Sequence, residues 1–446
     1  MEKVETLNKF EQASSVNEAM GKYRWTICAL VFFATTVNYL DRSVISLLKA
    51  NLTTELNWDD ADYANTEIAF KFTYAFGMLF AGRLIDKLGS KMGYLLATGL
   101  WSVAAVGHAL VQSTLGFIIA RSALGLTEAG NFPAAIKTVA EWFPKKERAL
   151  ATGIFNSGAN VGAIIAPMTV PFIAEAWGWK WAFVLTGSVG FIWLVLWMIM
   201  YDKPERHPKL SKEELRYINS DKDEQSAATT EKVSWFKLLS YRQTWAFVMG
   251  KFITDPIWWF YLFWLPDFLQ SEYGLKGTAV SVPVAVVYVI STFGSVGGGW
   301  LPLRFIRAGW PVFKARRTSM LIYAFVVLPI LFAQVAGQTS MWLAVLVIGI
   351  ATSAHQAWSA NIFTTVSDMF PKKAVASVTG IGGMFGGLGG ILLTAVVQKN
   401  MFVYYRSINQ IETAYFIMFC ICAGAYLVAW LVMKALVPKH KVITDL

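Results

Sequence analysis

Seven ionisable side chains lie inside stretches of the chain that are otherwise apolar enough to span a membrane. Four are basic and three are acidic: Asp41, Arg42, Lys71, Arg121, Glu128, Lys251 and Asp255. A charge at the bilayer centre costs roughly 3 kcal/mol on insertion scales, so such residues normally face a polar cavity and serve a function. This balance of charge favours an anion, and the carboxylates could carry protons. We therefore expect an anion-binding site that exchanges protons.

Asp41 and Arg42 are adjacent, so their side chains project about 100° apart on a helix. The Arg42 guanidinium can hold a carboxylate through two hydrogen bonds. The alternative is a structural ion pair near the outer membrane surface. We favour the functional interpretation because two neighbouring charges within a span carry a desolvation cost that packing alone rarely warrants.

Arg121, Gly125 and Glu128 lie on one stripe of a predicted helix, at positions i, i+4 and i+7. Glu128 is expected near the middle of the bilayer, where loss of hydration favours the protonated form of a carboxylic acid. We therefore expect Glu128 to exchange protons, with Arg121 tuning its charge. The competing interpretation is a fixed ion pair between Glu128 and a neighbouring base.

Polar residues on two other predicted helices could contact a bound anion. Lys71 and Tyr74 share one face, where an ammonium can neutralise a second charge or meet hydroxyl groups. Lys71 could instead extend outward to the membrane surface. Asn156 and Asn160 lie one helical turn apart and could bond sugar hydroxyls or join neighbouring helices. The sequence does not decide between these two roles.

Lys251, Asp255 and Trp258 form another i, i+4, i+7 stripe, with Tyr261 close by. The Lys251 and Asp255 charges could neutralise each other, so a structural role and a binding role are equally open. Trp258 and Tyr261 suit a sugar ring, because each combines an apolar face with a hydrogen-bonding rim.

A further group of polar residues surrounds a histidine in a later apolar stretch. A lone helical histidine is usually a packing residue, but its polar neighbours favour a wall that contacts substrate. The group contains His355, Gln356, Ser359 and Asn361. No His, Cys or Asp pattern has metal-ligand spacing, and no nucleophile–base motif appears. We expect no metal, no cofactor and no enzymatic activity.

Composition places these residues in a membrane protein. The chain has 446 residues, of which 55% are hydrophobic and 15% are charged, whereas soluble proteins carry about 25% charged residues. The net charge of +10 does not indicate nucleic acid binding, because most of the Lys and Arg residues fall in one set of alternate loops and in the termini. This asymmetry predicts a multi-pass inner-membrane protein with both termini in the cytoplasm.

The apolar segments predict an all-α fold with twelve transmembrane helices. They are approximately 25–48, 66–86, 93–112, 115–141, 149–174, 180–201, 244–269, 280–303, 318–336, 341–365, 374–398 and 412–436. A polar linker separates the sixth and seventh spans and contains Ser211, a candidate start for a short surface helix. The predicted domains are a tail at 1–24, a six-helix half at 25–201, a linker at 202–243, a six-helix half at 244–436 and a tail at 437–446.

The two predicted halves carry a related loop. The residues EWFPKK at 141–146 are followed by Ala149, Thr152 and Gly153, and DMFPKK at 368–373 is followed by Ala376 and, three and four residues later, Thr and Gly. The offset is 227 residues in each case, and both loops join an even-numbered span to an odd-numbered one. A six-span internal repeat is typical of transporters built from two parallel repeats.

The segment GRLIDKLGSK at 82–91, between the second and third spans, resembles the loop motif of the major facilitator superfamily. In that family the loop helps to latch the two halves in one conformation, which implies a gating role for Gly82, Asp86, Lys87, Gly89 and Lys91. The alternative is topology alone, because Lys87 and Lys91 would hold this loop in the cytoplasm.

Two further motifs narrow the resemblance. The segments NYLDR at 38–42 and Arg121-x-x-x-Gly125-x-x-Glu128 are similar to those of the anion:cation symporter family, and later segments around Lys251 and His355 resemble its hexuronate transporters. The family carries organic anions with protons or, in some members, sodium ions. The resemblance implies that Arg42, helped by Tyr39, binds the substrate carboxylate. It also implies that Asp41 and Glu128 are the proton sites.

We therefore expect a proton-coupled symporter that imports a sugar-acid anion, a hexuronate such as glucuronate or galacturonate, by alternating access. The expected partners are this small anion, protons and the lipid bilayer, with the protein acting as a monomer. Alternatives are a symporter for an aldonate, an aromatic acid or phosphate, and an organic-anion exporter. A membrane receptor that does not transport is a more distant alternative, because the linker is too short to hold a signalling domain.

Overall fold

A computed structural model describes residues 21–220, 234–370, 372–439 and 443. Within the helices of these ranges, the side chains at 79, 83, 86, 145, 146, 148–150, 296, 367, 372, 373, 375 and 376 are not described. The described part of the chain is almost entirely helical and contains no β-strand.

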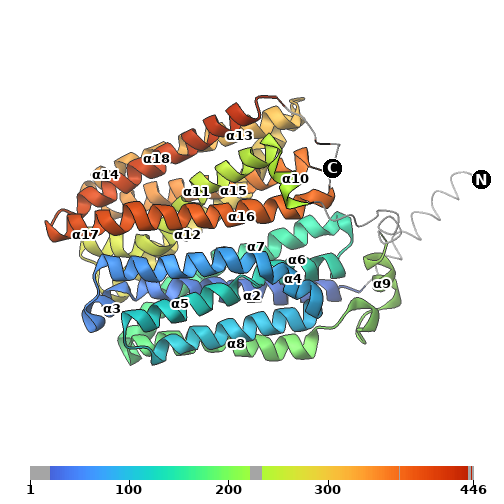
Figure 1. Cartoon of the computed structure of the whole chain (residues 1–446), viewed down its shortest axis with the longest axis horizontal. Helices are drawn as coiled ribbons and strands as arrows, with labels where there is room; N and C mark the ends of the chain where they lie inside the picture. The colour runs from blue at the N-terminus through green and yellow to red at the C-terminus, as the bar shows by residue number, and fades with distance from the viewer. Residues whose placement is uncertain (1–20, 221–233, 371, 440–442, 444–446) are drawn as a thin grey trace, which may run out of the picture.

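The helices form two bundles that are separate in sequence and lie one above the other in Figure 1. The first bundle contains α2 (Tyr23–Leu47), α3 (Lys49–Leu56), α4 (Asp60–Gly107), η1 (His108–Leu110), α5 (Thr114–Glu128), α6 (Asn131–Trp142), α7 (Lys145–Trp177) and α8 (Trp179–Met200). The second contains α11 (Arg242–Tyr273), η3 (Gly277–Val280), α12 (Ser281–Arg307), α13 (Val312–Val327), η4 (Leu328–Phe332), α14 (Ala333–Thr339), α15 (Met341–Met369), α16 (Lys372–Leu392), η5 (Leu393–Gln398), α17 (Lys399–Ser407) and α18 (Ile411–Leu436). Along the chain, the two bundles are separated by η2 (Pro204–Arg206), α9 (Lys212–Ile218) and α10 (Trp235–Leu239).

Each of the twelve predicted spans falls mainly on helical residues. Eight helices of the described chain are long and apolar enough to cross a membrane by length and composition alone. The other four predicted spans are α2, the first part of α4, α5 with α6, and α11. These are the spans that carry the seven predicted charges, because each charged side chain lowers the mean hydropathy of its segment.

Several predicted spans differ in detail from the helices. The second and third spans are one long helix, α4, interrupted at Gly89, where φ is +79°. Glycine adopts this conformation at no steric cost, so the chain turns there without ending the helix. Near the end of the eleventh span, the helix passes through a π-helical turn, η5.

The helix that precedes the repeated loop, predicted at an offset of 227 residues, ends in the same way in both bundles. Helix α6 ends at Trp142 and α15 ends at Met369, and in each case the next residue is an extended phenylalanine. Phe143 has φ −127° and ψ 136°, and Phe370 has φ −113° and ψ 146°. A new helix then begins within two residues, so the sequence repeat is also a structural repeat.

Three helices of each bundle meet at the junction between the bundles: α2, α4 and α7 pack against α11, α16 and α12, respectively. Within the first bundle, α7 lies very close to α2, because a Cβ atom at Gly162 would sit 2.4 Å from the carbonyl oxygen of Thr36. Small residues that permit such approach are typical of packed membrane helices.

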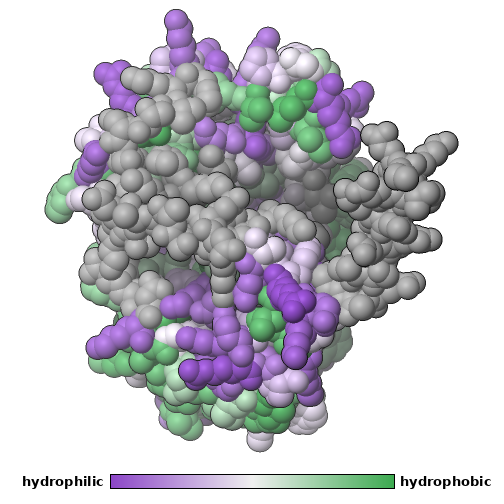
Figure 2. Space-filling model, turned by 90° about the vertical axis from the view of Figure 1, so that its right-hand side faces the viewer, coloured by the Kyte–Doolittle hydropathy of each residue, from purple (hydrophilic) through white to green (hydrophobic). Residues whose placement is uncertain are grey.

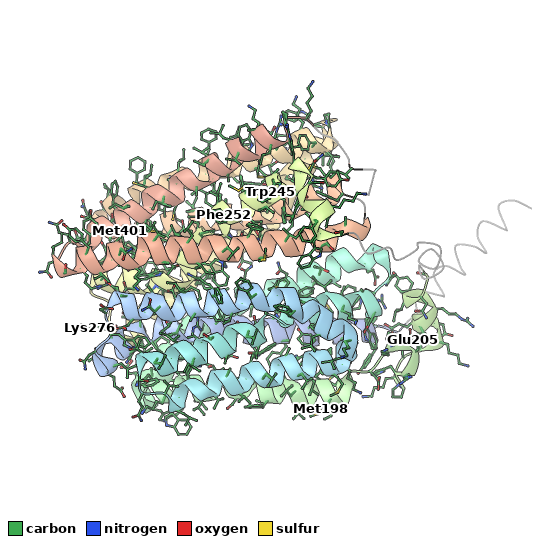
Figure 3. All side chains as sticks on the ribbon, viewed as in Figure 1. Met198, Glu205, Trp245, Phe252, Lys276 and Met401 are labelled. Atoms are coloured by element: carbon green, nitrogen blue, oxygen red, sulfur yellow. The ribbon has the colours of Figure 1, made fainter. Side chains whose placement is uncertain are left out.

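Both ends of the bundles are identified by the segments that lie there. The end that carries α9 and α10, at the right of Figure 1, is here called the linker end, and the end that carries α3, α14 and α17 is called the far end. Glu205 marks the linker end in Figure 3, and Lys276 and Met401 mark the far end. Figure 2 looks onto the linker end, where hydrophilic residues gather on both bundles.

The predicted surface helix in the linker is α9, with Ser211 as its N-cap. Its Glu214 is buried, and both carboxylate oxygens accept hydrogen bonds at 3.1 Å from the backbone N–H groups of Tyr23 and Arg24. Arg24 also bonds Glu147 of α7 at 2.8 Å. The linker helix therefore caps the free N–H groups at the start of α2.

Candidate functional site

Arg42 on α2 and Glu128 at the end of α5 form a buried ion pair. Arg42 Nε donates to Glu128 Oε2 at 3.0 Å, and Nη2 lies 2.9 Å from the same oxygen. Nη2 also donates to Asn38 Oδ1 at 3.1 Å. The two side chains are 3% and 0% exposed, so the pair lies in a poorly hydrated region where charge–charge interactions are strong. Glu128 Oε1 has no hydrogen-bond partner among the described residues.

Four aromatic rings surround the Arg42 guanidinium at the junction between the bundles. Its Cζ atom lies 4.6 Å from the ring centre of Tyr39 and 4.7 Å from that of Tyr74. Phe70 is at 5.3 Å, and Trp259, which belongs to α11 of the second bundle, is at 5.5 Å. Aromatic faces attract a cation and exclude water. The Arg42 guanidinium is therefore enclosed by rings from both bundles, because Trp259 belongs to the second.

Asp41 and Arg121 are buried in the first bundle without hydrogen-bond partners among the described residues. Neither carboxylate oxygen of Asp41 has a partner, although Asp41 lies near the Thr186 hydroxyl. All three nitrogens of Arg121 also lack partners, and its Cζ atom lies 4.3 Å from the Phe70 ring. Arg121 is within electrostatic range of Glu128 but does not bond it. The sequence predicted that Arg121 tunes the charge of Glu128. The base that bonds Glu128 is Arg42.

Lys71 links the two bundles. Its Nζ lies 2.9 Å from Glu67 Oε2 and donates to Thr394 Oγ1 at 2.7 Å, within η5 of the second bundle. Thr394 in turn donates to Gln398 Oε1 at 2.9 Å. Lys71 is 1% exposed, so it does not extend to the membrane surface. π-Helical turns occur often at functional sites, and this one places Thr394 against Lys71.

Lys251 and Asp255 form a pair on α11, with Nζ and Oδ2 2.7 Å apart. Lys251 also lies over the Phe363 ring at 4.3 Å. Nearby, the half-buried Trp258 stacks on His355 with ring centres 5.2 Å apart, and His355 Nδ1 lies 2.6 Å from the Tyr426 hydroxyl. These groups make one wall of the second bundle.

Amide side chains connect the bundles near this wall. Asn160 Nδ2 donates to Ser295 Oγ at 3.4 Å, and Gln356 Nε2 reaches Asn160 Oδ1 at 3.5 Å. Asn156 is exposed and Ser359 is half-buried. Their contact with substrate remains a prediction.

Two residues predicted to contact substrate lie inside the second bundle. Tyr261 is 1% exposed, and its carbonyl oxygen accepts a hydrogen bond from the Tyr288 hydroxyl at 3.4 Å. Asn361 Nδ2 donates to the Gly298 carbonyl at 2.6 Å and so joins α15 to α12. Their observed contacts are between helices of one bundle, and a role in binding substrate remains a prediction.

The predicted gating loop lies at the linker end. Lys91 Nζ bonds Asp202, at the start of the linker, at 3.1 Å. The Lys203 backbone N–H, together with Lys91, holds the pKa of Asp202 below its usual range. Gly82 and Lys87 lie on the described backbone, whereas the Asp86 side chain is outside the described residues. A latch between the halves at this loop remains a prediction.

Charged residues at the far end join the bundles and were not predicted from the sequence. Lys49 Nζ lies 2.7 Å from Asp60 and 2.9 Å from Asp267, and Arg406 bonds both carboxylates. The Tyr415 hydroxyl also donates to Asp267. Glu67 and Asp267 both lie within predicted spans, and the i, i+4 spacing of Glu67 and Lys71 is a sequence signal that would have identified Glu67.

Ion pairs between the two bundles lie at the far end. At the far end, Lys49, Asp60, Asp267 and Arg406 form ion pairs across the junction between the bundles. At the linker end, Arg24 pairs with Glu147 inside the first bundle, and Arg316 pairs with Asp368 inside the second. The bundles are therefore tied together by polar contacts at the far end.

Comparison with known proteins identifies similar chains. The family model described as Major Facilitator Superfamily matches residues 31–394. The hexuronate transporter of Escherichia coli (strain K12) is 33% identical over 376 residues, covering 84% of this chain and 87% of that protein. The galacturonate transporter of Dickeya chrysanthemi is 32% identical over 283 residues, covering 63% of this chain and 82% of that protein.

Solved structures share the architecture. A crystal structure of a bacterial homologue of the human lysosomal transporter Spinster, in an inward-facing and occupied conformation, superposes with a TM-score of 0.72. The match covers 96% of this chain and 100% of that chain at 16% sequence identity. At this identity, the likeness concerns the fold alone.

Proposed function

Because the chain belongs to the major facilitator superfamily, we propose that it is a proton-coupled symporter that imports a hexuronate such as glucuronate or galacturonate. The chain is a multi-pass membrane transporter, not an enzyme, with twelve transmembrane helices in two six-helix halves. The similarity to a hexuronate transporter and a galacturonate transporter supports a sugar-acid anion as the substrate.

The observation that carries this proposal is the buried ion pair between Arg42 and Glu128 at the junction of the bundles. Arg42 is the residue best placed to hold a substrate carboxylate, but Glu128 occupies its Nε and Nη2 donors. A substrate carboxylate and the Glu128 carboxylate therefore compete for one guanidinium. Protonation of Glu128 removes its negative charge and frees Arg42 for the substrate.

This competition couples the anion to a proton. A proton that enters from outside neutralises Glu128, the substrate carboxylate then binds Arg42, and the bundles rock to expose the site on the other side. Release of the proton restores the Arg42–Glu128 pair and displaces the substrate. Asp41, adjacent to Arg42 and without a hydrogen-bond partner among the described residues, is a second proton carrier. The hydroxyl groups of the substrate meet the wall that carries Trp258, His355 and the Asn160–Gln356 pair.

We further propose the orientation and the moving parts. The asymmetry of Lys and Arg between loops places the linker end and both termini in the cytoplasm, in an inner membrane. The moving bodies are residues 25–201 and 244–436, joined by the linker at 202–243. The ion pairs across the far end would then close the site to the outside.

Transport in proteoliposomes tests the function. The purified chain should accumulate labelled glucuronate when the outside is acidic, and a proton ionophore should abolish the accumulation. Glu128→Gln should lose proton-driven accumulation yet retain exchange of internal for external substrate. Glu272→Gln, a partly buried glutamate that bonds Gln334, is the matched control and should behave like the parent chain. Uphill uptake by Glu128→Gln would refute the role of Glu128.

A competition panel identifies the substrate. Unlabelled glucuronate and galacturonate should inhibit uptake at lower concentrations than an aldonate, an aromatic acid or phosphate. Stronger inhibition by any of the last three would refute a hexuronate as the main substrate while leaving an anion symporter intact.

A further inference from the structure

The Lys251–Asp255 pair lies on the wall of α11 that meets the first bundle. The Asp255 carboxylate packs against α16, since a Cβ atom at Gly386 would lie 2.2 Å from Asp255 Oδ2. The next residue of α16, Gly387, meets Ala75 of the first bundle, with a Cβ atom there 2.9 Å from the Ala75 Cβ. Ala75 follows Tyr74, one of the rings around Arg42. The pair is therefore held at the junction near the proposed carboxylate site.

The spacing along α11 relates this pair to Arg42. Arg42 rests on Trp259, and Asp255 lies four residues earlier on the same helix, a rise of about 6 Å. Asp255 is also within electrostatic range of the Tyr39 hydroxyl, and Lys251 is within range of His355. The Lys251 ammonium, bonded to Asp255, thus lies on the order of 10 Å from Arg42, near the span of a six-carbon acid with a contact at each end.

The charge on this wall determines which anions fit. When Glu128 is protonated, Arg42 offers one free positive charge to one carboxylate. Lys251 would attract a second carboxylate at the other end of a sugar diacid, but Asp255 already neutralises it at 2.7 Å. A diacid would also place its second carboxylate against that of Asp255, and like charges in a poorly hydrated site repel strongly.

We propose that Asp255 is a specificity-determining residue that restricts the transporter to sugar-acid monoanions by neutralising Lys251 and repelling a second carboxylate. This rests on the proposed function, in which Arg42 holds the first carboxylate. Asp255 and Lys251 have side chains 19% and 8% exposed, so this pair is less enclosed than Glu67 and Lys71, whose side chains are 0% and 1% exposed.

Glu272 provides a matched control on the same helix. It lies 17 residues after Asp255 on α11, a rise of about 25 Å, and its carboxylate accepts a hydrogen bond from Gln334 at 3.3 Å. Removing this charge therefore leaves Lys251 and the junction near Arg42 unchanged.

Equilibrium binding to the purified full-length chain at pH 6 tests the proposal, with glucuronate as the monoanion and glucarate as the six-carbon dianion. The parent chain should prefer glucuronate. Asp255→Asn should shift the ratio of the two dissociation constants toward glucarate by about tenfold or more, because Lys251 gains a free charge. Asp255→Ser provides the same change with a smaller side chain if the Asn variant does not fold. The double variant Lys251→Met with Asp255→Asn should lose the gain, and Glu272→Gln should keep the parent ratio.

The outcomes separate this proposal from the proposed function. An unchanged ratio in folded Asp255→Asn and Asp255→Ser that still bind glucuronate would overturn it. A gain that persists in the double variant, or that appears equally in Glu272→Gln, would also overturn it, since the effect would not depend on Lys251. Failure of the parent chain to bind glucuronate would instead refute the proposed function.

Discussion

Replacing Glu128 by glutamine should make substrate affinity nearly independent of pH. In the parent chain at high pH, the substrate carboxylate must displace Glu128 from the Nε and Nη2 groups of Arg42. That displacement leaves a buried carboxylate without its partner, which costs about 3 kcal/mol or more. Since each 1.4 kcal/mol is a factor of ten, the parent chain should bind glucuronate roughly 100-fold more weakly when Glu128 is ionised than when it is protonated.

The direction of the pH dependence follows from which protonation form of Glu128 competes with the substrate for Arg42. Only ionised Glu128 holds Arg42, so affinity should rise as the pH falls and Glu128 becomes protonated. The neutral amide of Glu128→Gln mimics the protonated acid, so the variant should bind tightly at both pH 6 and pH 8, with dissociation constants within about threefold. Titration calorimetry of the purified chain at the two pH values measures this ratio.

A charge-preserving variant provides the control. Glu128→Asp keeps a titratable carboxylate near Arg42 and should retain a large pH dependence. If Glu128→Gln still shows a pH dependence of glucuronate affinity, and adding Asp41→Asn removes it, titration of Asp41 is its cause. A full 100-fold dependence in both Glu128→Gln and this double variant would refute competition between these carboxylates and the substrate for Arg42.

Four other substitutions have defined expected effects. Arg42→Ala should abolish glucuronate binding in the same calorimetric assay; unchanged affinity would place the substrate carboxylate elsewhere. Arg406→Gln removes ion pairs at the far end and should increase the distances between spin labels placed on the two bundles there. An unchanged distance distribution would show that these pairs do not hold the far end closed. Gly162→Val should lower the melting temperature, because overpacking costs about 1–3 kcal/mol of stability. Gly153→Ala, where a Cβ meets open space, should leave the melting temperature unchanged. Equal effects of the two variants would contradict the close approach of α7 to α2. Glu214→Gln weakens the cap on α2 and should cost about 1–2 kcal/mol of stability by thermal unfolding, so an unaltered melting curve would argue against a structural role for α9.

Much of the fold could be predicted from the sequence because the bilayer imposes it. A segment of about 20 apolar residues must be helical to satisfy its backbone, so the spans were readable from hydropathy. The loop repeat also predicted a structural repeat, and Phe143 and Phe370 adopt the same extended backbone. Details that depend on one residue, such as the positive φ of Gly89 within α4, were not readable because hydropathy does not report a local dihedral angle.

The candidate site was only partly predictable. Stripes within one helix were visible, as with Lys251 and Asp255, because residues four apart share a face. Pairings between helices were not, since they depend on the rotation and tilt of each helix, which packing sets. Arg42 meets Glu128 across 86 positions and Lys71 meets Thr394 across 323 positions.

The sequence by itself determined that charged residues lie within membrane spans, which residue types they are, and which of them share a helical face. These features follow from composition and from the 3.6-residue period of the helix. Only the tertiary structure decided which charges compensate each other. It pairs Glu128 with Arg42 and bonds Lys71 to Thr394. It also brings Lys49 and Asp267 together across the junction at the far end. The physical reason is that a buried charge is stabilised by whatever partner packing brings within about 3 Å, and that partner can come from any part of the chain.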